Sequence, residues 1–236
     1  MIKSVLRALA LAALFIAAPA AAEIQGPVLV FGGTSGTGLA TVQNLRAMDV
    51  PVTVFVRPTS NTGALDALGV DLVVGDALNA DDVLRAFDAD DFKTVVSSLG
   101  GRRGEPRPDL DGNKNITAAA KAKGVKRIVQ VSSIGVGSTR EPPGPDAPFM
   151  AEVFYIKTLA EDDLIASGLD YTIVRPGGLR RGEATGTGVI ADEEHMGSID
   201  RQELGRLIVS EVLADDSTIG KVVYAYDPTL PAPEEE

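Results

Sequence analysis

The sequence of 236 residues contains no cysteine and no tryptophan, a single histidine and few aromatic residues of any kind. The absence of cysteine excludes disulfide bonds, thiolate nucleophiles and cysteine-ligated metals. His195, the single histidine, follows three acidic residues in a polar stretch, a setting typical of a solvated side chain, so we predict no metal site. Because aromatic side chains are scarce, Val, Ile, Leu and Ala must fill the core. The hydrophobic content of 44% suffices for one domain.

Positive charge is also in short supply, since 22 Lys and Arg residues face 33 Asp and Glu residues and the formal net charge is -11. A surface this acidic repels polyanions, which argues against nucleic acid as a partner. A small ligand that carries phosphate groups must therefore be held by local features that overcome the field of the whole chain.

Long hydrophobic runs are missing apart from a short one at the start. Two basic residues precede an apolar stretch from Ala8 to Ala18, and a run of small residues ends at Ala22. This is the layout of a secretory signal peptide cleaved after Ala22, and the stretch is shorter than the roughly 20 residues that span a bilayer. We predict a signal peptide or N-terminal extension over residues 1–22 and no stable membrane span after cleavage. The protein is then exported to a periplasm, or cytoplasmic if the signal is not genuine.

Short β-branched runs alternate with helical patterns through the rest of the chain, residues 23–236. The strand-like runs are 28–31, 52–56, 72–74, 94–96, 127–131, 171–174 and 222–226, and the helical patterns are 37–47, 64–68, 81–87, 113–123, 149–166 and 201–213. Such alternation predicts βαβ units and a parallel sheet, whose continuously apolar strands are buried on both faces. The fold class is therefore α/β, a single Rossmann-type, doubly wound parallel sheet with helices on both faces, whose ligand sits at the carboxyl ends of the strands.

A glycine-rich loop follows the first predicted strand and opens the first predicted helix. Its spacing is G-x-x-x-G-x-G, which permits a tight turn and lets a pyrophosphate approach backbone N–H groups at the positive end of the helix. The position after the first strand of a βαβ unit strengthens a motif that is weak by itself. The predicted cofactor-binding residues here are Gly32, Thr34, Ser35, Gly36, Thr37 and Gly38.

The end of the second predicted strand indicates which nicotinamide cofactor is preferred. NAD-specific proteins usually carry a carboxylate there for the ribose 2′-hydroxyl, but this strand ends at Val56 and is followed by Arg57. A guanidinium suits the 2′-phosphate of NADP. We therefore predict NADP(H) as cofactor, bound in part by Arg57, with NAD(H) as the less favoured alternative.

Further segments resemble the atypical short-chain dehydrogenase/reductases, the NAD(P)H-binding, NmrA-like group near the flavin and biliverdin reductases. They are Val74-Gly75-Asp76, Ser97-Ser98-Leu99-Gly100, the run from Gly124 to Ser133, Lys157 with Ala160-Glu161, and the block from Ser167 to Leu179. The resemblance extends from Val28 to Tyr226. It implies that the cofactor is also lined by Asp76, Ser98, Leu99, Gly100, Ser132, Lys157, Pro176, Gly177 and Gly178.

The same resemblance implies catalytic roles and one departure from them. Active members use a serine after the fifth strand to polarise a carbonyl, here Ser133, and a lysine on the next helix, here Lys157. Their tyrosine acid lies four residues before the lysine, where this sequence has Val153. Tyr155 is two residues from Lys157, a helical offset that turns it to another side.

This departure favours hydride transfer to an acceptor that needs no acid from the protein. The predicted function is an NADP(H)-binding oxidoreductase that reduces a small redox-active or conjugated acceptor such as a flavin, a quinone or a tetrapyrrole. The alternative is a non-catalytic NAD(P)H-binding redox sensor or assembly factor, because fold and cofactor motif do not establish catalysis. Arg102 and Arg103, after the fourth strand, are candidates for meeting an anionic substrate or the cofactor phosphates, with an exposed basic loop as the alternative. We expect a monomer or a homodimer.

Overall fold

The structure is a computed structural model that describes residues 24–101, 104 and 107–232. The signal peptide predicted for residues 1–22 and the candidates Arg102 and Arg103 lie outside this part of the chain. Within the described ranges, no helix is long and apolar enough to cross a membrane.

The centre of the fold is an eight-stranded sheet in the order β3-β2-β1-β4-β5-β6-β10-β8. The strands are β1 (Val28–Phe31), β2 (Val52–Val56), β3 (Asp71–Val74), β4 (Thr94–Ser97), β5 (Arg127–Val131), β6 (Asp170–Pro176), β8 (Val189–Ala191) and β10 (Lys221–Tyr226). All are parallel except β8, which pairs antiparallel with β10 at the edge. The Rossmann-type α/β prediction is confirmed, with β8 as an unforeseen antiparallel strand.

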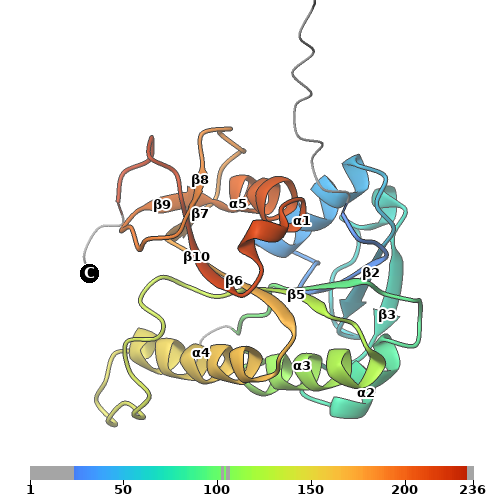
Figure 1. Ribbon diagram of the computed structural model, residues 1–236, viewed down its shortest axis with the longest axis horizontal. Helices are drawn as coiled ribbons and strands as arrows, with labels where there is room; N and C mark the ends of the chain where they lie inside the picture. The colour runs from blue at the N-terminus through green and yellow to red at the C-terminus, as the bar shows by residue number, and fades with distance from the viewer. Residues whose placement is uncertain (1–23, 102–103, 105–106, 233–236) are drawn as a thin grey trace, which may run out of the picture.

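Helices cover both faces of the sheet (Figure 1). The helices α2 (Ala80–Ala86), α3 (Asp111–Lys123) and α4 (Phe149–Ala166) lie along one face, and α1 (Gly36–Ala47) and α5 (Arg201–Leu207) lie on the other. Short 3-10 turns, η1 (Asp66–Leu68) and η3 (Asp216–Thr218), and a π-helical segment, η2 (Ile208–Leu213), complete the helical elements. The single helix expected over 201–213 is therefore α5 followed by η2.

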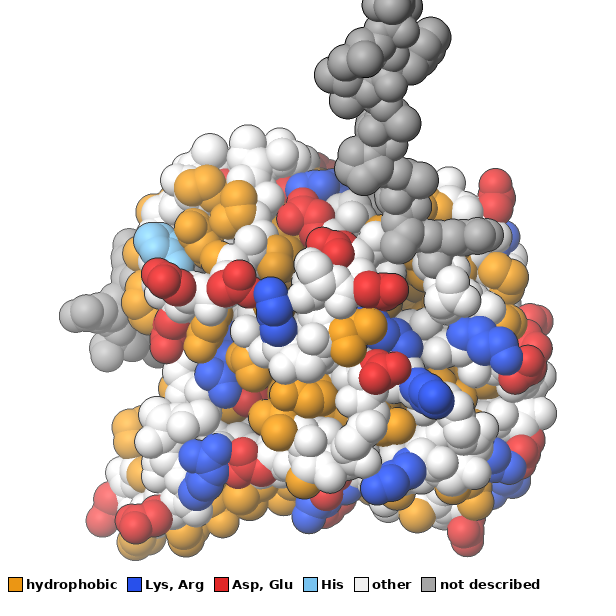
Figure 2. Space-filling view, viewed as in Figure 1, with side chains coloured by type: hydrophobic (Ala, Val, Ile, Leu, Met, Phe, Trp, Pro, Cys, Tyr) orange, Lys and Arg blue, Asp and Glu red, His pale blue; other side chains and the backbone are white. Residues whose placement is uncertain are grey.

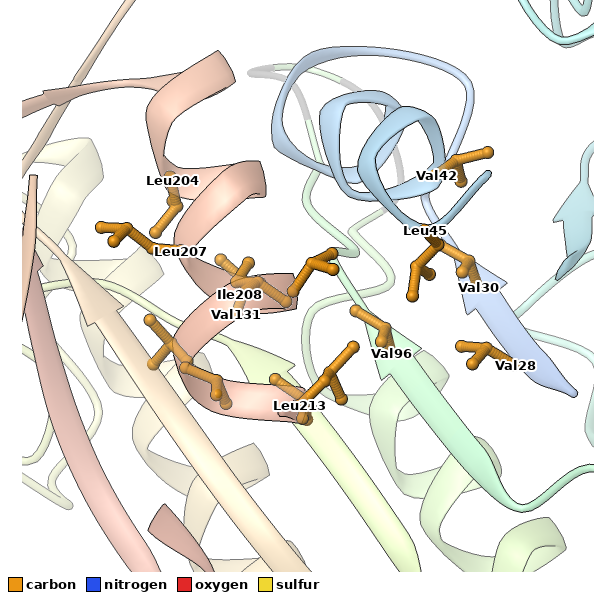
Figure 3. Packing of buried hydrophobic residues seen from close by; sticks show 14 of the residues in the cluster. Val28, Val30, Val42, Leu45, Val96, Val131, Leu204, Leu207, Ile208 and Leu213 are labelled. Carbon is orange, nitrogen blue, oxygen red and sulfur yellow. The ribbon is translucent and has the colours of Figure 1, made fainter. Parts of the chain in front are cut away.

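The hydrophobic core has two layers because side chains alternate between the faces of each strand. Val28 and Val30 of β1 point to the α1 and α5 side, whereas Leu29 and Phe31 point to the opposite side. Figure 3 shows the first layer, where Leu45 of α1 and the leucines of α5 meet the strand valines. Burial of both faces explains why the strands read as continuous apolar runs rather than alternating ones.

A small second sheet joins two segments that the sequence patterns did not predict as strands. It pairs β7 (Gly178–Arg180) in parallel with β9 (Ser198–Asp200). Each strand has three residues, too few to leave a periodic signal in the sequence. The pairing holds the segment after β6 against the start of α5.

The surface carries both signs of charge in close mixture. On the face drawn in Figure 2, acidic and basic side chains alternate with neutral ones. His195 is exposed, as expected, and its ring lies 4.1 Å from that of Tyr226. Among the described residues, no group of three or more His, Cys, Asp or Glu side chains is arranged to hold a metal ion.

Candidate functional site

The predicted site residues meet at one edge of the sheet because they follow parallel strands. The glycine loop follows β1, Arg57 follows β2 and Asp76 follows β3, while the serine pair 132–133 follows β5. The register of these parallel strands brings their carboxyl ends together. This edge is where an open α/β sheet binds its ligand.

The glycines of the loop are required by close backbone contacts. Gly32 has a φ of +79°, and a Cβ on it would lie 2.5 Å from the carbonyl oxygen of Ser98. A Cβ on Gly38 would lie 2.2 Å from the carbonyl oxygen of Gly32. Both distances are shorter than any real contact, so the loop keeps its tight turn only without side chains at these positions. The loop therefore leaves the first turn of α1 open to a ligand.

The N-terminus of α1 has donors that find no acceptor among the described residues, which suits an anion. Ser35 occupies the N-cap position, but its side chain makes no capping hydrogen bond. The first amide of the helix with an acceptor in the described part of the chain is that of Leu39, which donates to the Ser35 carbonyl oxygen. The Thr37 hydroxyl is buried and has no hydrogen-bond partner among the described residues. These groups fit a pyrophosphate, which would accept from the free amides and the hydroxyl.

Arg57 and Asp76 stand at the ends of β2 and β3, on the adenosine side of the predicted site. Arg57 is exposed, and its amide donates to the Ser60 hydroxyl in a tight turn. The Arg57 guanidinium makes no hydrogen bond or ion pair within the described part of the chain. One carboxylate oxygen of Asp76 accepts from the Leu78 amide. The turn orients this carboxylate, and its second oxygen has no hydrogen-bond partner in the part of the chain that the structure describes.

Arg201, the first residue of α5, reaches the glycine loop and was not found by sequence reasoning. A Cβ on Gly36 would lie 3.2 Å from Cδ of Arg201, so this side chain passes directly over the start of α1. Its guanidinium donates to the carbonyl oxygens of Leu179 and Arg180. The approach depends on Gly205, where a Cβ would lie 2.4 Å from that of Ala40. Only the packing of α1 on α5 brings Arg201 to this place.

Lys157 belongs to a buried cluster that sequence reasoning also missed. Its Nζ lies 3.1 Å from Oδ1 of Asp109, and Nη2 of Arg107 lies 3.1 Å from Oδ2 of the same carboxylate. Asp109 is fully buried, and the side chains of Lys157 and Arg107 are only 12% and 14% exposed. The Gly101 amide also donates to Asp109. No periodicity or motif marks Asp109, because its contacts with Arg107 and Lys157 arise only from tertiary packing.

The serine pair 132–133 directly follows β5. The hydroxyl of Ser132 is buried and has no hydrogen-bond partner among the described residues, and Ser133 is half-buried. The loop that follows is seated on α4, since the Gly137 amide donates to the Thr158 hydroxyl at 2.8 Å. Val153, at the position of the family's tyrosine, is 5% exposed and offers no acid.

The segment 176–178 is held by backbone contacts and by an ion pair behind it. A Cβ on Gly177 would lie 2.1 Å from the Gly197 carbonyl oxygen, to which Gly178 donates its amide. Glu161 of α4 pairs with Arg175 through two hydrogen bonds of 2.5 and 3.2 Å. Ser98, Leu99 and Gly100 lie between the glycine loop and the Asp109 cluster. The predicted residues thus form one continuous edge.

Asp227, directly after β10, fastens the loop 185–187 to this edge. Its carboxylate accepts from the hydroxyls of Thr185, Thr187 and Thr229 and from the Thr229 amide. Burial alone would raise the pKa of Asp227, but the hydrogen bonds outweigh it and lower that pKa to about 2. The carboxylate therefore stays ionised down to strongly acidic pH.

We expect Asp227→Asn to lower the free energy of unfolding by about 2 kcal/mol near pH 7. The pKa of Asp227 is depressed from its ordinary value of 3.8 to about 2, so its contribution is complete above 3.8 and lost as the pH falls through 2. Urea unfolding of both proteins as a function of pH measures this. Asp192→Asn, at an exposed ion pair with Lys221, is the control and should change stability by less than about 1 kcal/mol. A deficit in Asp227→Asn that stays constant down to pH 2 would assign the effect to packing instead of charge.

Comparison with known proteins agrees with this geometry. The profile of a family described as NAD(P)H-binding matches residues 32–216. A chloroplastic protein of Arabidopsis thaliana, itself uncharacterized, is 30% identical over 83% of this chain and 75% of its own. A candidate NAD-dependent epimerase/dehydratase of Bacillus halodurans has a similar structure, with a TM-score of 0.73 and 30% identity over 86% of this chain and 95% of that one. ChuY, an anaerobillin reductase of Escherichia coli O157:H7, superposes with a TM-score of 0.73 at 28% identity, over 88% of this chain and 100% of its own.

Proposed function

We propose that this chain, which belongs to the NAD(P)H-binding family of atypical short-chain dehydrogenase/reductases, is an NADP(H)-dependent reductase of a small, conjugated acceptor. The observation that carries the proposal is the anion-binding geometry at the start of α1. No side chain caps this helix, the glycine loop leaves room above its first turn, and the buried Thr37 hydroxyl has no hydrogen-bond partner among the described residues. Similarity to an anaerobillin reductase supports a conjugated acceptor. The protein would act as a monomer or a homodimer.

The residues that would hold the cofactor fall into three groups, according to the part of the cofactor that each group would contact. Amides of residues 36–38, with Thr34, Ser35 and Thr37, would bind the pyrophosphate, and Arg201 would add a positive charge there. Arg57 would bind the 2′-phosphate and Asp76 would lie beside the adenine. The segments 98–100 and 176–178, with Ser132 and Lys157, would line the nicotinamide half. When bound, NADPH supplies a hydride.

The chain's own residues constrain the chemistry at the acceptor. The Ser133 hydroxyl would donate a hydrogen bond to an acceptor oxygen, and the Lys157 ammonium would stabilise negative charge that develops there. Reduction by two electrons also requires a proton, and buried Val153 offers none. The proton would therefore come from water, which suits a conjugated acceptor whose reduced form is protonated in solvent.

A second candidate function is a non-catalytic NADP(H) sensor. The observation that favours it is the ion pair of Lys157 with buried Asp109, because this pair neutralises part of the positive charge that would act on an acceptor. The two functions differ in turnover. A reductase oxidises NADPH in the presence of a flavin or quinone acceptor, whereas a sensor binds NADPH without oxidising it.

Arg57→Asp is the test of the cofactor assignment. We expect NADPH to bind on the order of tenfold to a hundredfold more weakly, because a charge-assisted contact to phosphate is replaced by repulsion. NADH should bind more tightly than to the original protein, since a carboxylate suits a ribose 2′-hydroxyl. Nicotinamide fluorescence and calorimetry measure both affinities in parallel.

The matched control is Lys126→Asp, which makes the same change of charge at an exposed residue next to the amino end of β5. It lies at the opposite edge of the sheet and should leave both affinities unchanged. If the original protein binds neither NADPH nor NADH, the reductase and the sensor functions both fail.

A further inference from the structure

We infer that Arg107 forms a subsite for a carboxylate of the acceptor, so that the substrate class of this enzyme is a conjugated organic anion. The inference rests on the proposed function, because it names the class of molecule that the reductase takes. It is carried by the cluster of Arg107, Asp109 and Lys157.

The cluster lies directly beside the predicted nicotinamide half of the site. Arg107 packs on Gly101, where a Cβ would lie 2.7 Å from its Cγ, and its Nη1 is 3.4 Å from the Gly101 carbonyl oxygen. Gly101 follows the segment 98–100, and Ser98 touches the glycine loop at Gly32. On the other side the cluster includes Lys157 itself. Arg107 thus contacts Gly101, the residue that directly follows the expected cofactor segment 98–100.

Among the described residues, this cluster carries a net positive charge in a largely buried place. Two cations, Arg107 and Lys157, share the single carboxylate of Asp109. Elsewhere in the described part of the chain, the carboxylates buried against arginines are matched one to one. Glu161 binds Arg175 through two hydrogen bonds, and Glu203 binds Arg206 in the same way. An unmatched buried cation is costly unless an anion joins it, and a bound carboxylate would supply that anion.

The donors of the cluster are also incompletely used. Nζ of Lys157 lies at ion-pair distance from Oδ1 of Asp109, yet that oxygen accepts no hydrogen bond of proper geometry from the described residues. Nε of Arg107 is buried without an acceptor in the same part of the chain. The guanidinium is held over the ring of Phe149 at 5.2 Å. Donors remain for an additional oxygen ligand, and the planar fork of a guanidinium fits a carboxylate.

The position of Arg107 favours the acceptor over the cofactor as its ligand. The cofactor phosphates would have their own cradle at the start of α1, where the side chain of Arg201 passes over Gly36. Arg107 lies instead after β4, on the α4 side of the sheet, next to Lys157, which is expected in the nicotinamide half of the site. An anionic acceptor would also gain from this local positive charge on a chain whose net charge is -11.

Binding of a matched pair of probes tests the inference without requiring turnover. The probes are an anthraquinone carboxylate and the corresponding neutral anthraquinone carboxamide. The affinity of each is measured by calorimetry with and without NADPH. We expect the carboxylate to bind on the order of tenfold to a hundredfold more tightly than the carboxamide. Arg107→Met should remove this preference while leaving NADPH affinity unchanged, and Arg107→Lys should restore part of it. Lys126→Met, at the opposite edge, should keep the full preference.

Several results would overturn the inference. They are equal binding of the two probes, binding of neither where NADPH binds, a preference that survives Arg107→Met, or a loss of NADPH affinity in that variant, which would assign Arg107 to the cofactor. Failure of the proposed function is seen separately, as absence of NADPH binding to the original protein. The preference for the carboxylate can still be measured in that case, since the probes are also titrated alone.

Discussion

Gly38→Ala is expected to weaken NADPH binding on the order of a hundredfold, the loss that a misplacement of about 1 Å can cause. The added Cβ would lie 2.2 Å from the carbonyl oxygen of Gly32 and 2.8 Å from its carbonyl carbon. Because both contacts are with backbone, no side-chain rotation relieves them, and the start of α1 must move away from β1. The amides that would bind the pyrophosphate move with it.

Stability measurements separate this effect from unfolding. Overpacking of this kind costs about 1–3 kcal/mol. Urea unfolding of Gly38→Ala would then show a lower free energy of unfolding with a complete transition from folded to unfolded protein. Gly144→Ala is the matched control, since a Cβ there meets nothing within 4 Å and its φ is not positive. Undiminished NADPH affinity in a folded Gly38→Ala protein would mean that the pyrophosphate is not bound at this loop.

Asp109→Ala is expected to lower the free energy of unfolding by about 3–5 kcal/mol. Asp109 is fully buried and neutralises two cations, each less than 15% exposed, so its removal leaves both charges without a partner in a poorly solvated place. The orientation of Lys157 depends on the same carboxylate. Thermal and urea unfolding measure the loss, and NADPH titration of the folded fraction reports on the lysine.

An exposed ion pair provides the comparison for this variant. Asp91 pairs with Lys93, and these side chains are 86% and 48% exposed, so Asp91→Ala should cost less than about 1 kcal/mol. In the double variant of Asp109→Ala with Lys157→Ala, part of the lost stability should return, because one uncompensated cation is removed. Equal losses in Asp109→Ala and Asp91→Ala would show that the buried cluster contributes no more than a surface pair.

Prediction from the sequence succeeded where a pattern is local. The strand 127–131 and the helix 149–166 have the bounds that the structure gives β5 and α4, because a buried strand and a long helix leave distinct periodicities. The glycine loop was recognised because its whole motif lies within seven consecutive residues, 32–38, that form one turn. The three-residue strands β7, β8 and β9 were missed, since they depend on partners distant in the chain.

The candidate site divides in the same way. The residues predicted to bind the cofactor follow the ends of strands, and the parallel order of the sheet brings them to one edge without further information. Arg201, Arg107 and Asp109 could not be predicted because no local pattern marks them. Arg201 reaches the glycine loop only through the contact of Gly205 with Ala40, and Arg107 approaches Lys157 only through the buried carboxylate of Asp109.

The sequence by itself determined the fold class, the glycine loop and the absence of the tyrosine acid, because hydrophobic periodicity, residue spacing and residue identity are properties of the chain alone. The tertiary structure alone decided which charges are buried together. Whether a carboxylate faces one cation or two depends on how a loop folds against a helix some fifty positions later in the chain, and at Asp109 it faces two. That imbalance is a property of packing, and it is the reason for expecting an anionic acceptor.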